Sequence, residues 1–465
     1  MSALSMILTA SAPRCHRRRL RRWARAGAFT GCCLFALPAL LRAAEPAAEP
    51  PPAEEEEWSA HAQATVISEQ HDHFPAKYSG ANSLEQSEPR RTSVTATLFL
   101  GARLPWKGGE IFLDPEIAGG EGFSGVTGIA GFPNGDIQRV SSPTPTGYVA
   151  RLFYRQTLAL GNASEKVEGD VHQLAGTLPA SRMTITLGKV SAADFFDGNA
   201  YSHDPRGQFM NWALMDNGAW DYPADTRGYT FGGVVEWKRP GWGLRYGAFS
   251  MPKVANGAEF DHRLPAALGQ VAELERSTHL LRRPGTVRLL VYRNGAHMGS
   301  YRQAIESPGP QGPDVTLSRA YRVKYGFGVR LEQKIARDLG AFAHLGWNDG
   351  HTESFAFTEI DRTAAAGLNL TGSRWHREDD VVGIAAVLNG LSADHRDYLR
   401  SGGYGFILGD GRLRYGYEEI AEVYYRGKIA AHLFLTADFQ FVEHPAYNRD
   451  RGPVAVAGTR AHVEF

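Results

Sequence analysis

The sequence predicts an all-β fold: a transmembrane antiparallel β-barrel of about 16 strands, with long extracellular loops and a short disordered N-terminal arm. Three observations predict it. Apolar and polar residues alternate with a period of two in runs of about ten residues, separated by clusters of Gly, Pro, Asn and Asp. No stretch after residue 45 reaches the roughly 18 uninterrupted apolar residues that a transmembrane helix needs. The last residue, Phe465, closes one of the alternating runs.

The first 44 residues predict a secretory signal peptide. Basic residues gather between Arg14 and Arg25 without an acidic residue, an apolar stretch runs from Ala28 to Leu41, and small residues follow. At about 14 residues the apolar stretch is shorter than a membrane-spanning helix, which needs about 20. We expect cleavage near Ala44.

Composition limits what the mature chain can do. All three cysteines (Cys15, Cys32 and Cys33) lie in the predicted signal, so neither disulfides nor thiol chemistry are expected after cleavage. The signal also holds eight arginines and no acid, which leaves 42 basic against 50 acidic residues, a net charge of −8. This balance argues against a nucleic-acid partner, which would need a basic surface.

The mature chain divides into an arm and one domain. Residues 45–57 are rich in Pro and Glu, a composition typical of a disordered segment. Residues 58–465 show no further change in composition and are expected to form a single barrel domain. The soluble alternative, a β-sandwich, would show the same local alternation but rarely places so many strands in one domain.

Sixteen candidate strands follow from the alternation. In one of them Tyr148, Ala150, Leu152 and Tyr154 are expected to face lipid, and Val149, Arg151, Phe153 and Arg155 the lumen. Residues 265–283 have a helix-like spacing of apolar residues and are expected to form a loop helix. The predicted strands are 58–69, 92–104, 109–119, 147–159, 181–190, 227–238, 241–252, 285–294, 322–335, 339–348, 352–361, 364–372, 379–389, 413–426, 430–442 and 453–465.

An even strand count places both termini on the periplasmic side. Short links at 105–108, 239–240 and 427–429 are then periplasmic, and long links at 70–91, 120–146, 191–226, 253–284 and 390–412 are extracellular, as bacterial barrels require. Residues 295–321 do not fit, because they would form a long periplasmic insertion. Aromatic residues near strand ends suggest interfacial girdles or ordinary strand propensity: Trp58, Trp106, Trp237, Trp242, Trp347, Tyr424 and Tyr425.

Segments along nearly all of the mature chain resemble the carbohydrate-selective porins of the OprB type. The clearest is Pro445–Pro453, which reads P-A-Y-N-R-D-R-G-P before the last strand. The resemblance implies a sixteen-stranded pore in the outer membrane of a Gram-negative bacterium, for passive, substrate-selective uptake of sugars into the periplasm. The other matching segments are 58–65, 78–80, 82–84, 114–116, 130–132, 188–214, 347–350, 402–405 and 409–411.

A sugar-selective pore needs charged and amide groups that exchange hydrogen bonds with hydroxyls, and aromatic faces for the sugar ring. Arg151 and Arg155 lie four apart on one strand and point the same way, and Asp114 and Glu116 face them from the next strand. Such a cluster sets up a field across the lumen. The alternative is a static ladder of ion pairs that stiffens the wall.

Residues 194–227 are the best candidate for a loop folded into the channel. Their acids, amides and tryptophans suit sugar recognition, although an outward-facing solvated loop would have a similar composition. The candidate residues here are Asp194, Asp204, Arg206, Trp212 and Trp220.

The expected partners are monosaccharides or short oligosaccharides, the surrounding outer-membrane lipid, and the barrel-assembly machinery, which would read the terminal Phe465. No catalytic residues, metal or cofactor are expected. A general diffusion porin and a polysaccharide-export barrel remain alternatives. An outer-membrane barrel enzyme is disfavoured because the chain lacks a Gly-x-Ser-x-Gly nucleophile motif. An oligomer is compatible with the pattern, since a subunit interface shows the same apolar alternation as a lipid-facing wall.

Overall fold

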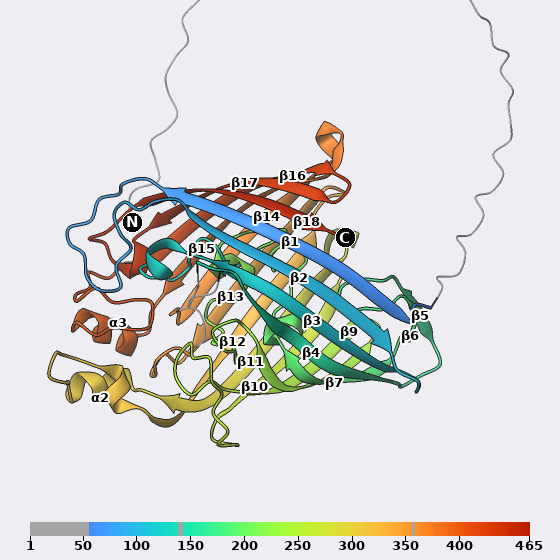
Figure 1. The fold of residues 1–465 in the computed structure, drawn as a ribbon, viewed down its shortest axis with the longest axis horizontal. Coiled ribbons are helices and arrows are strands. Elements are labelled where there is room, and N and C mark those ends of the chain that lie inside the picture. The colour runs from blue at the N-terminus through green and yellow to red at the C-terminus, as the bar shows by residue number, and fades with distance from the viewer. Residues whose placement is uncertain (1–54, 138–142, 356–358) are drawn as a thin grey trace, which may run out of the picture. The chain divides into compact units, whose positions relative to one another are not determined.

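The computed structural model describes residues 55–137, 143–355 and 359–465. The predicted signal peptide and residues 45–54 of the predicted arm lie outside these residues. Sixteen of the described strands close into one antiparallel barrel (Figure 1), in which the last strand pairs with the first. They are β1 (Trp58–His71), β2 (Arg91–Arg103), β3 (Gly109–Gly120), β4 (Thr146–Ala159), β7 (Arg182–Val190), β8 (Thr230–Arg239), β9 (Trp242–Ser250), β10 (Leu268–Thr278), β11 (Gly285–Met298), β12 (Ala320–Lys334), β13 (Leu339–Asn348), β14 (Arg362–Gly372), β15 (Arg377–Gly390), β16 (Glu418–Ala430), β17 (Leu433–Glu443) and β18 (Val454–Glu464).

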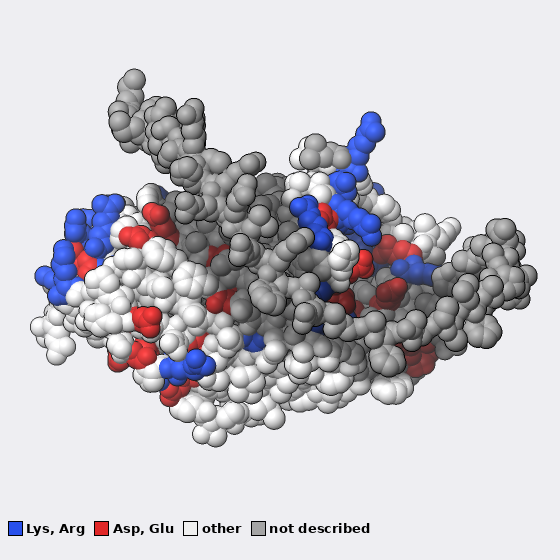
Figure 2. Space-filling view, turned by 90° about the horizontal axis from the view of Figure 1, so that it is seen from above, with Lys and Arg blue, Asp and Glu red and all other residues white. Residues whose placement is uncertain are grey.

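Side-chain alternation explains why these segments form a barrel. In β2, Ser93, Thr95 and Thr97 are buried in the interior, whereas Leu98 on the outer face is exposed. A closed ring leaves no strand edge unpaired, as a membrane requires. In Figure 2 the lower part of the visible wall is a broad uncharged surface, whereas charged side chains gather at the left and across the upper middle and right of the view. This arrangement confirms the predicted barrel. In the part of the chain that the structure describes, no helix is long and apolar enough to cross a membrane.

Two strand assignments were wrong, and their errors cancel in the count. Residues 268–278, expected in a helix, form β10 and pair with β9 and β11. The helix-like spacing arose because apolar residues lie on both faces of this strand: Leu268 and Leu274 face outward, and Val271 faces the interior. The described residues of 352–361 form no strand, and Thr352 makes only an isolated bridge to Ser300.

The two errors inverted the expected direction of the strands between them. With β10 in place, residues 299–319 connect β11 to β12 at the end that carries the other long loops, so no long periplasmic insertion exists there. The link 253–284 is likewise not one loop, because β10 divides it. The residues after β4 instead form a separate hairpin at the opposite end, β5 (Ser164–Val167) with β6 (Gly176–Pro179).

A β-bulge reverses the predicted side-chain orientation at the start of β4. Asp114 pairs with Arg151, but Pro115 pairs with Val149, so Ala150 has no partner. Proline cannot donate a backbone hydrogen bond to the ladder, and a bulge accommodates it. As a result Val149 faces outward and Tyr148 faces inward, the reverse of the expectation, while the facing from Arg151 onward is as predicted.

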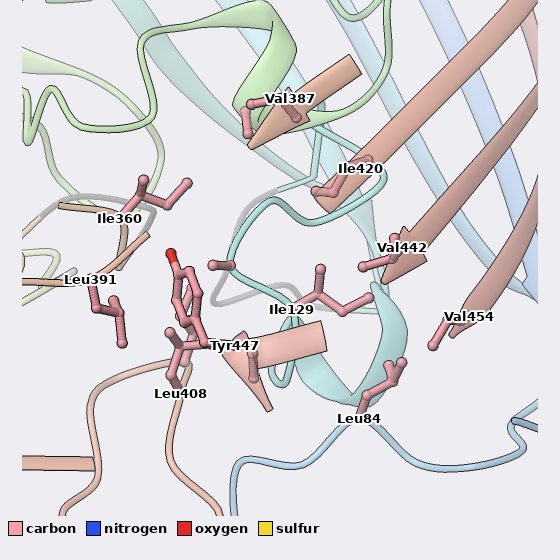
Figure 3. Close-up of a cluster of buried hydrophobic side chains, with 14 of the residues drawn as sticks. Leu84, Ile129, Ile360, Val387, Leu391, Leu408, Ile420, Val442, Tyr447 and Val454 are labelled. Carbon is pink, nitrogen blue, oxygen red and sulfur yellow. The ribbon is translucent and has the colours of Figure 1, made fainter. Parts of the chain in front are cut away.

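The long loops fold over one end of the barrel and share a hydrophobic cluster (Figure 3). Leu84 and Ile129 come from the first two loops and pack with Ile420, Val442 and Val454 at the strand ends. Short helices brace these loops: α1 (Trp212–Met215), α2 (Tyr301–Glu306) and α3 (Ala393–Arg400), and the 3-10 turns η1 (Phe123–Gly125), η2 (Ala192–Asp194), η4 (Val315–Ser318) and η6 (Pro445–Tyr447). The turns η3 (Leu280–Arg282) and η5 (Ser373–Trp375) lie at the other end.

Most of the expected girdle residues are exposed on the barrel surface. Trp58, Trp106, Trp237 and Trp242 lie at the ends of strands on the periplasmic side and point outward. Tyr424 is the exception, because the alternation of β16 turns it into the interior, where it packs against Phe209. The side chains that face outward are therefore those that could occupy headgroup depth.

Candidate functional site: a constriction in the lumen

The loop between β7 and β8, residues 191–229, crosses the inside of the barrel. Its Asp197 is paired with Arg330 of β12, at 2.9 Å, and the carbonyl of Gln208 accepts a hydrogen bond from Arg460 of β18, at 2.8 Å. On β16, Glu422 accepts from the backbone N–H of Asn211, at 3.0 Å. Charged side chains on three separate strands therefore hold the loop within the lumen.

The loop between β3 and β4 also enters the barrel. Glu418 of β16 accepts hydrogen bonds from the backbone N–H groups of Ala130, at 3.0 Å, and Gly131, at 2.8 Å. On β2, Ser93 accepts one from Asn134, at 2.8 Å. Side chains of β2, β12, β16 and β18 thus hold the two loops inside the barrel.

An open cavity of about 370 Å³ remains against β1–β4. Its volume lies within the range of small-molecule binding sites. Its charged lining comprises five carboxylates and three arginines, and two histidines, His172 and His203, also line it. The eight charged residues are Glu116, Asp136, Asp194, Asp204, Asp216, Arg151, Arg206 and Arg227.

Arg151 is the first cation of this wall. It projects inward from β4 and holds Asp194 of η2 through two hydrogen bonds, Nε to Oδ2 at 2.7 Å and Nη2 to Oδ1 at 2.6 Å. Its Nη1 also donates to Asp114 Oδ2 at 3.3 Å. Burial would raise the pKa of Asp194, but the positive charge of Arg151 outweighs it and lowers that pKa. Asp194 therefore presents a fixed negative charge beside the cavity.

Arg206 is the second cation and comes from the inserted loop. Its Nε donates to Asp136 at 2.8 Å and its Nη2 to Glu116 at 3.3 Å. Glu116 is also bound by the hydroxyls of Thr97, at 2.7 Å, and Tyr229, at 3.0 Å. Residues of β2 and of the inserted loop thus converge on one carboxylate of β3.

Aromatic side chains form another part of the cavity wall. Trp212 of α1 stacks on Phe132, with ring centroids 5.3 Å apart, and on Tyr222, at 6.0 Å. Trp212, Tyr222 and Tyr229 all line the cavity. Rings fixed in this way offer a rigid apolar face beside the charged groups.

A second cavity, of about 310 Å³, lies on the periplasmic side of the first. Arg155 lines it and donates a hydrogen bond to the carbonyl of His172, at 2.7 Å. The guanidinium also lies over the ring of Phe112, 4.9 Å from its centroid. Val171, His172 and Asp194 line both cavities.

The structure places the candidate residues in three groups. Arg151, Glu116, Asp194, Asp204, Arg206 and Trp212 line the first cavity. Arg155 lines the second. Asp114 and Trp220 line neither: Asp114 is fully buried behind Arg151, and Trp220 packs against Phe196.

Sequence reasoning did not single out Asp136, Tyr229 or His172. Asp136 and His172 lie in segments without strand pattern, so no periodicity marked them. Tyr229 precedes β8, and only the inserted loop brings its hydroxyl to Glu116. Within the described residues, no group of three or more His, Cys, Asp or Glu side chains is arranged to hold a metal ion.

Comparison with known proteins adds a family and a set of similar folds. The family model described as carbohydrate-selective porin, OprB family, matches residues 88–465. Among solved structures, the high-pH structure of Pseudomonas putida OprB aligns with a TM-score of 0.65 at 16% identity, over 88% of this chain and 94% of that chain. The outer membrane channel DcaP of Acinetobacter baumannii aligns with a TM-score of 0.49 at 10% identity, over 88% and 97%. At these identities the structural likeness is one of fold. A search of curated proteins found no significant match.

Proposed function

Because the chain belongs to the OprB family of carbohydrate-selective porins, we propose that its first cavity is the filter through which sugars pass. The protein is an outer-membrane, substrate-selective diffusion porin. Passage through it is passive, since diffusion down a gradient needs only a path and weak binding. The proposal concerns which residues select the solute.

The pairing of two arginines with carboxylates across one cavity is the observation that carries the proposal. Arg151 is held by Asp194, and Arg206 by Asp136 and Glu116, so both guanidinium groups stay at fixed positions. A planar guanidinium keeps further N–H donors beyond those used in its pairs. Sugar hydroxyls that lose water in the constriction can accept from these donors and donate to the carboxylates.

Aromatic rings supply the second requirement. Trp212 and Tyr229 line the same cavity as both arginines. The C–H face of a sugar ring is apolar and packs against an aromatic face. A general diffusion pore needs no such platform, and this feature favours a sugar filter over that alternative.

The test is single-channel conductance of the refolded mature protein in a planar bilayer, with and without glucose and short malto-oligosaccharides. We expect open steps that sugar reduces in a saturable way. The double variant Arg151→Gln with Arg206→Gln should weaken this block by at least about tenfold, the effect of losing about 1.4 kcal/mol of binding.

A matched control is Arg288→Gln. Arg288 also lies on the inner wall, paired with Glu275 at 3.0 Å and Glu332 at 3.2 Å, but it lines neither cavity. Its substitution should leave the sugar block unchanged. Steps that no sugar affects in the wild type would refute the sugar filter and favour a general porin or an exporter.

Two further parts of the proposal concern biogenesis. Residues 1–44 would direct export and be cleaved, and the terminal aromatic would be read by the assembly machinery. Phe465 supports the second role: it is 66% exposed, and its backbone pairs with Ala62 across the closing seam of the barrel. Its ring stacks on His432, with centroids 4.8 Å apart.

A further inference from the structure

The periplasmic hairpin β5–β6 reaches into the barrel. In Figure 1 it lies at the end opposite α2 and α3, where the short turns also lie. The link between its strands, residues 168–175, turns tightly, with reciprocal backbone hydrogen bonds between Asp170 and Gln173, at 2.9 and 3.0 Å. Leu174 behind the turn is buried, whereas Val171 at the tip is exposed to the cavities.

His172 at this tip is anchored to the lumen wall. Its Nε2 lies 2.7 Å from Oδ2 of the buried Asp114. Its ring meets Phe99 and Phe153 edge to face, with centroids 5.5 and 5.4 Å apart. Its carbonyl accepts from Arg155, at 2.7 Å. Residues of β2, β3 and β4 therefore contact His172, which reaches them from the periplasmic side.

The backbone at His172 supports a specific role for the tip. Its φ is +57°, in the left-handed region that residues other than glycine rarely adopt. Such a conformation costs free energy and persists only where the surroundings hold it. Here the residue in this conformation is His172, whose ring contacts the lumen wall.

The hairpin is fastened to the barrel rim at two places, at Ala175 in the link between its strands and at Glu165 in β5. The backbone N–H of Glu56 donates to the carbonyl of Ala175, at 3.1 Å, and the Glu56 carboxylate accepts from the N–H of Ala175, at 2.7 Å. Arg103 of β2 donates to the same carbonyl, at 2.8 Å. Arg182 of β7 is paired with Glu165 of β5, at 2.7 Å. These contacts fix the position of Val171 and His172 at the end of the hairpin.

We propose that this hairpin is the periplasmic half of the selectivity filter, with His172 and Val171 as specificity-determining residues. Three residues line both cavities: Asp194, from the loop that enters from outside, and Val171 and His172, from the hairpin that enters from the periplasm. A solute that moves from the first cavity to the second passes these side chains. The inference rests on the proposed pore function and adds a second element that sets its size limit.

The test removes the hairpin without disturbing the strands. The N–H of Leu160 donates to the carbonyl of Ser181, at 2.9 Å, so these residues already form the base of a closed turn. Replacing residues 161–180 with Asn-Gly would join β4 to β7 by a favoured two-residue turn. We expect the single-channel conductance in KCl to rise at least about twofold, because the narrowest section of the path limits the current.

A point substitution provides a second route should the replacement fail to assemble. Glycine adopts the left-handed backbone conformation without steric cost, so His172→Gly removes the ring without straining the turn. We expect a smaller conductance increase, and a change of about threefold or more in the constant for sugar block. His279→Gly, at the exposed turn before η3, is the matched control and should change neither value.

Conductance and sugar block separate the two proposals. Unchanged conductance in both hairpin variants, with sugar block intact, would overturn the hairpin's role and leave the sugar filter standing. Raised conductance in a channel that no sugar blocks would support the hairpin as the constriction and overturn the sugar filter.

Discussion

Arg151 and Asp194 form a two-point ion pair, with N–O distances of 2.7 and 2.6 Å, between the barrel wall and the inserted loop. Arg151 belongs to β4 and Asp194 to η2, so the pair sets the position of the loop beside the first cavity. Two-point pairs fix orientation as well as distance. Asp194 also borders the second cavity, and a change in this pair should therefore affect passage through the whole filter.

Asp194→Asn should shift ion selectivity toward anions. The substitution removes one negative charge and leaves Arg151 with Asp114 alone, at a local cost of about 1–3 kcal/mol. The reversal potential under a KCl gradient measures the shift. An unchanged potential would mean that Asp194 does not face the ion path.

Arg206→Gln should shift selectivity in the opposite direction, toward cations. The carboxylates of Glu116 and Asp136 would lose their cation, while Glu116 keeps its hydrogen bonds from Thr97 and Tyr229. The fold should therefore persist, which heat-modifiable migration in gels can verify. The same reversal-potential measurement applies, and a shift toward anions would contradict the placement of Arg206.

Alkaline pH should loosen the outer loops through His395. This residue of α3 lies 3.0 Å from Asp361 and 3.6 Å from Glu359, and its ring stacks on Tyr301. Burial would lower the pKa of His395, but the two carboxylates outweigh it and raise the pKa to about 9. Because its pKa is raised in the folded protein, protonated His395 stabilises the packing of the outer loops. This stabilisation is fully present below pH 6.5, the ordinary pKa of histidine, and is lost as the pH rises through about 9.

Trypsin cleavage at Arg396 and Arg400 reports this loosening. Relative to an unstructured peptide, the cleavage rate should rise by up to about tenfold between pH 7.5 and 9.5. His395→Gln should remove the pH dependence. A wild-type rate that follows the peptide at every pH would show that the cluster does not govern the loops.

Deleting Phe465 should lower the yield of assembled barrel in the outer membrane. The residue ends the strand that closes the ring and pairs with β1 through Ala62. Quantifying folded protein in outer-membrane fractions gives the yield. As a control, Phe441→Ala removes an exposed aromatic from the outer face of β17, away from the terminus, and should have less effect.

The charges that hold the loop lie too far apart in sequence for local pattern to pair them. Asp197 meets Arg330, and Arg206 meets Glu116, only after the barrel has closed. The sequence marked Arg206 and Glu116 as candidates by type, but not as partners. His172 carried no signal at all, because a histidine in an irregular segment is indistinguishable from one on a solvated turn.

The sequence by itself determined the barrel, because facing lipid or lumen is a local property that alternates along each strand. It also determined the inward direction of Arg151, Asp114 and Glu116, which depends on that alternation. Only the tertiary structure decided that residues 268–278 are a strand, since their hydrogen bonds come from β9 and β11. It alone decided that a loop and a hairpin enter the lumen from opposite ends, because the contacts that hold them join residues far apart in the chain.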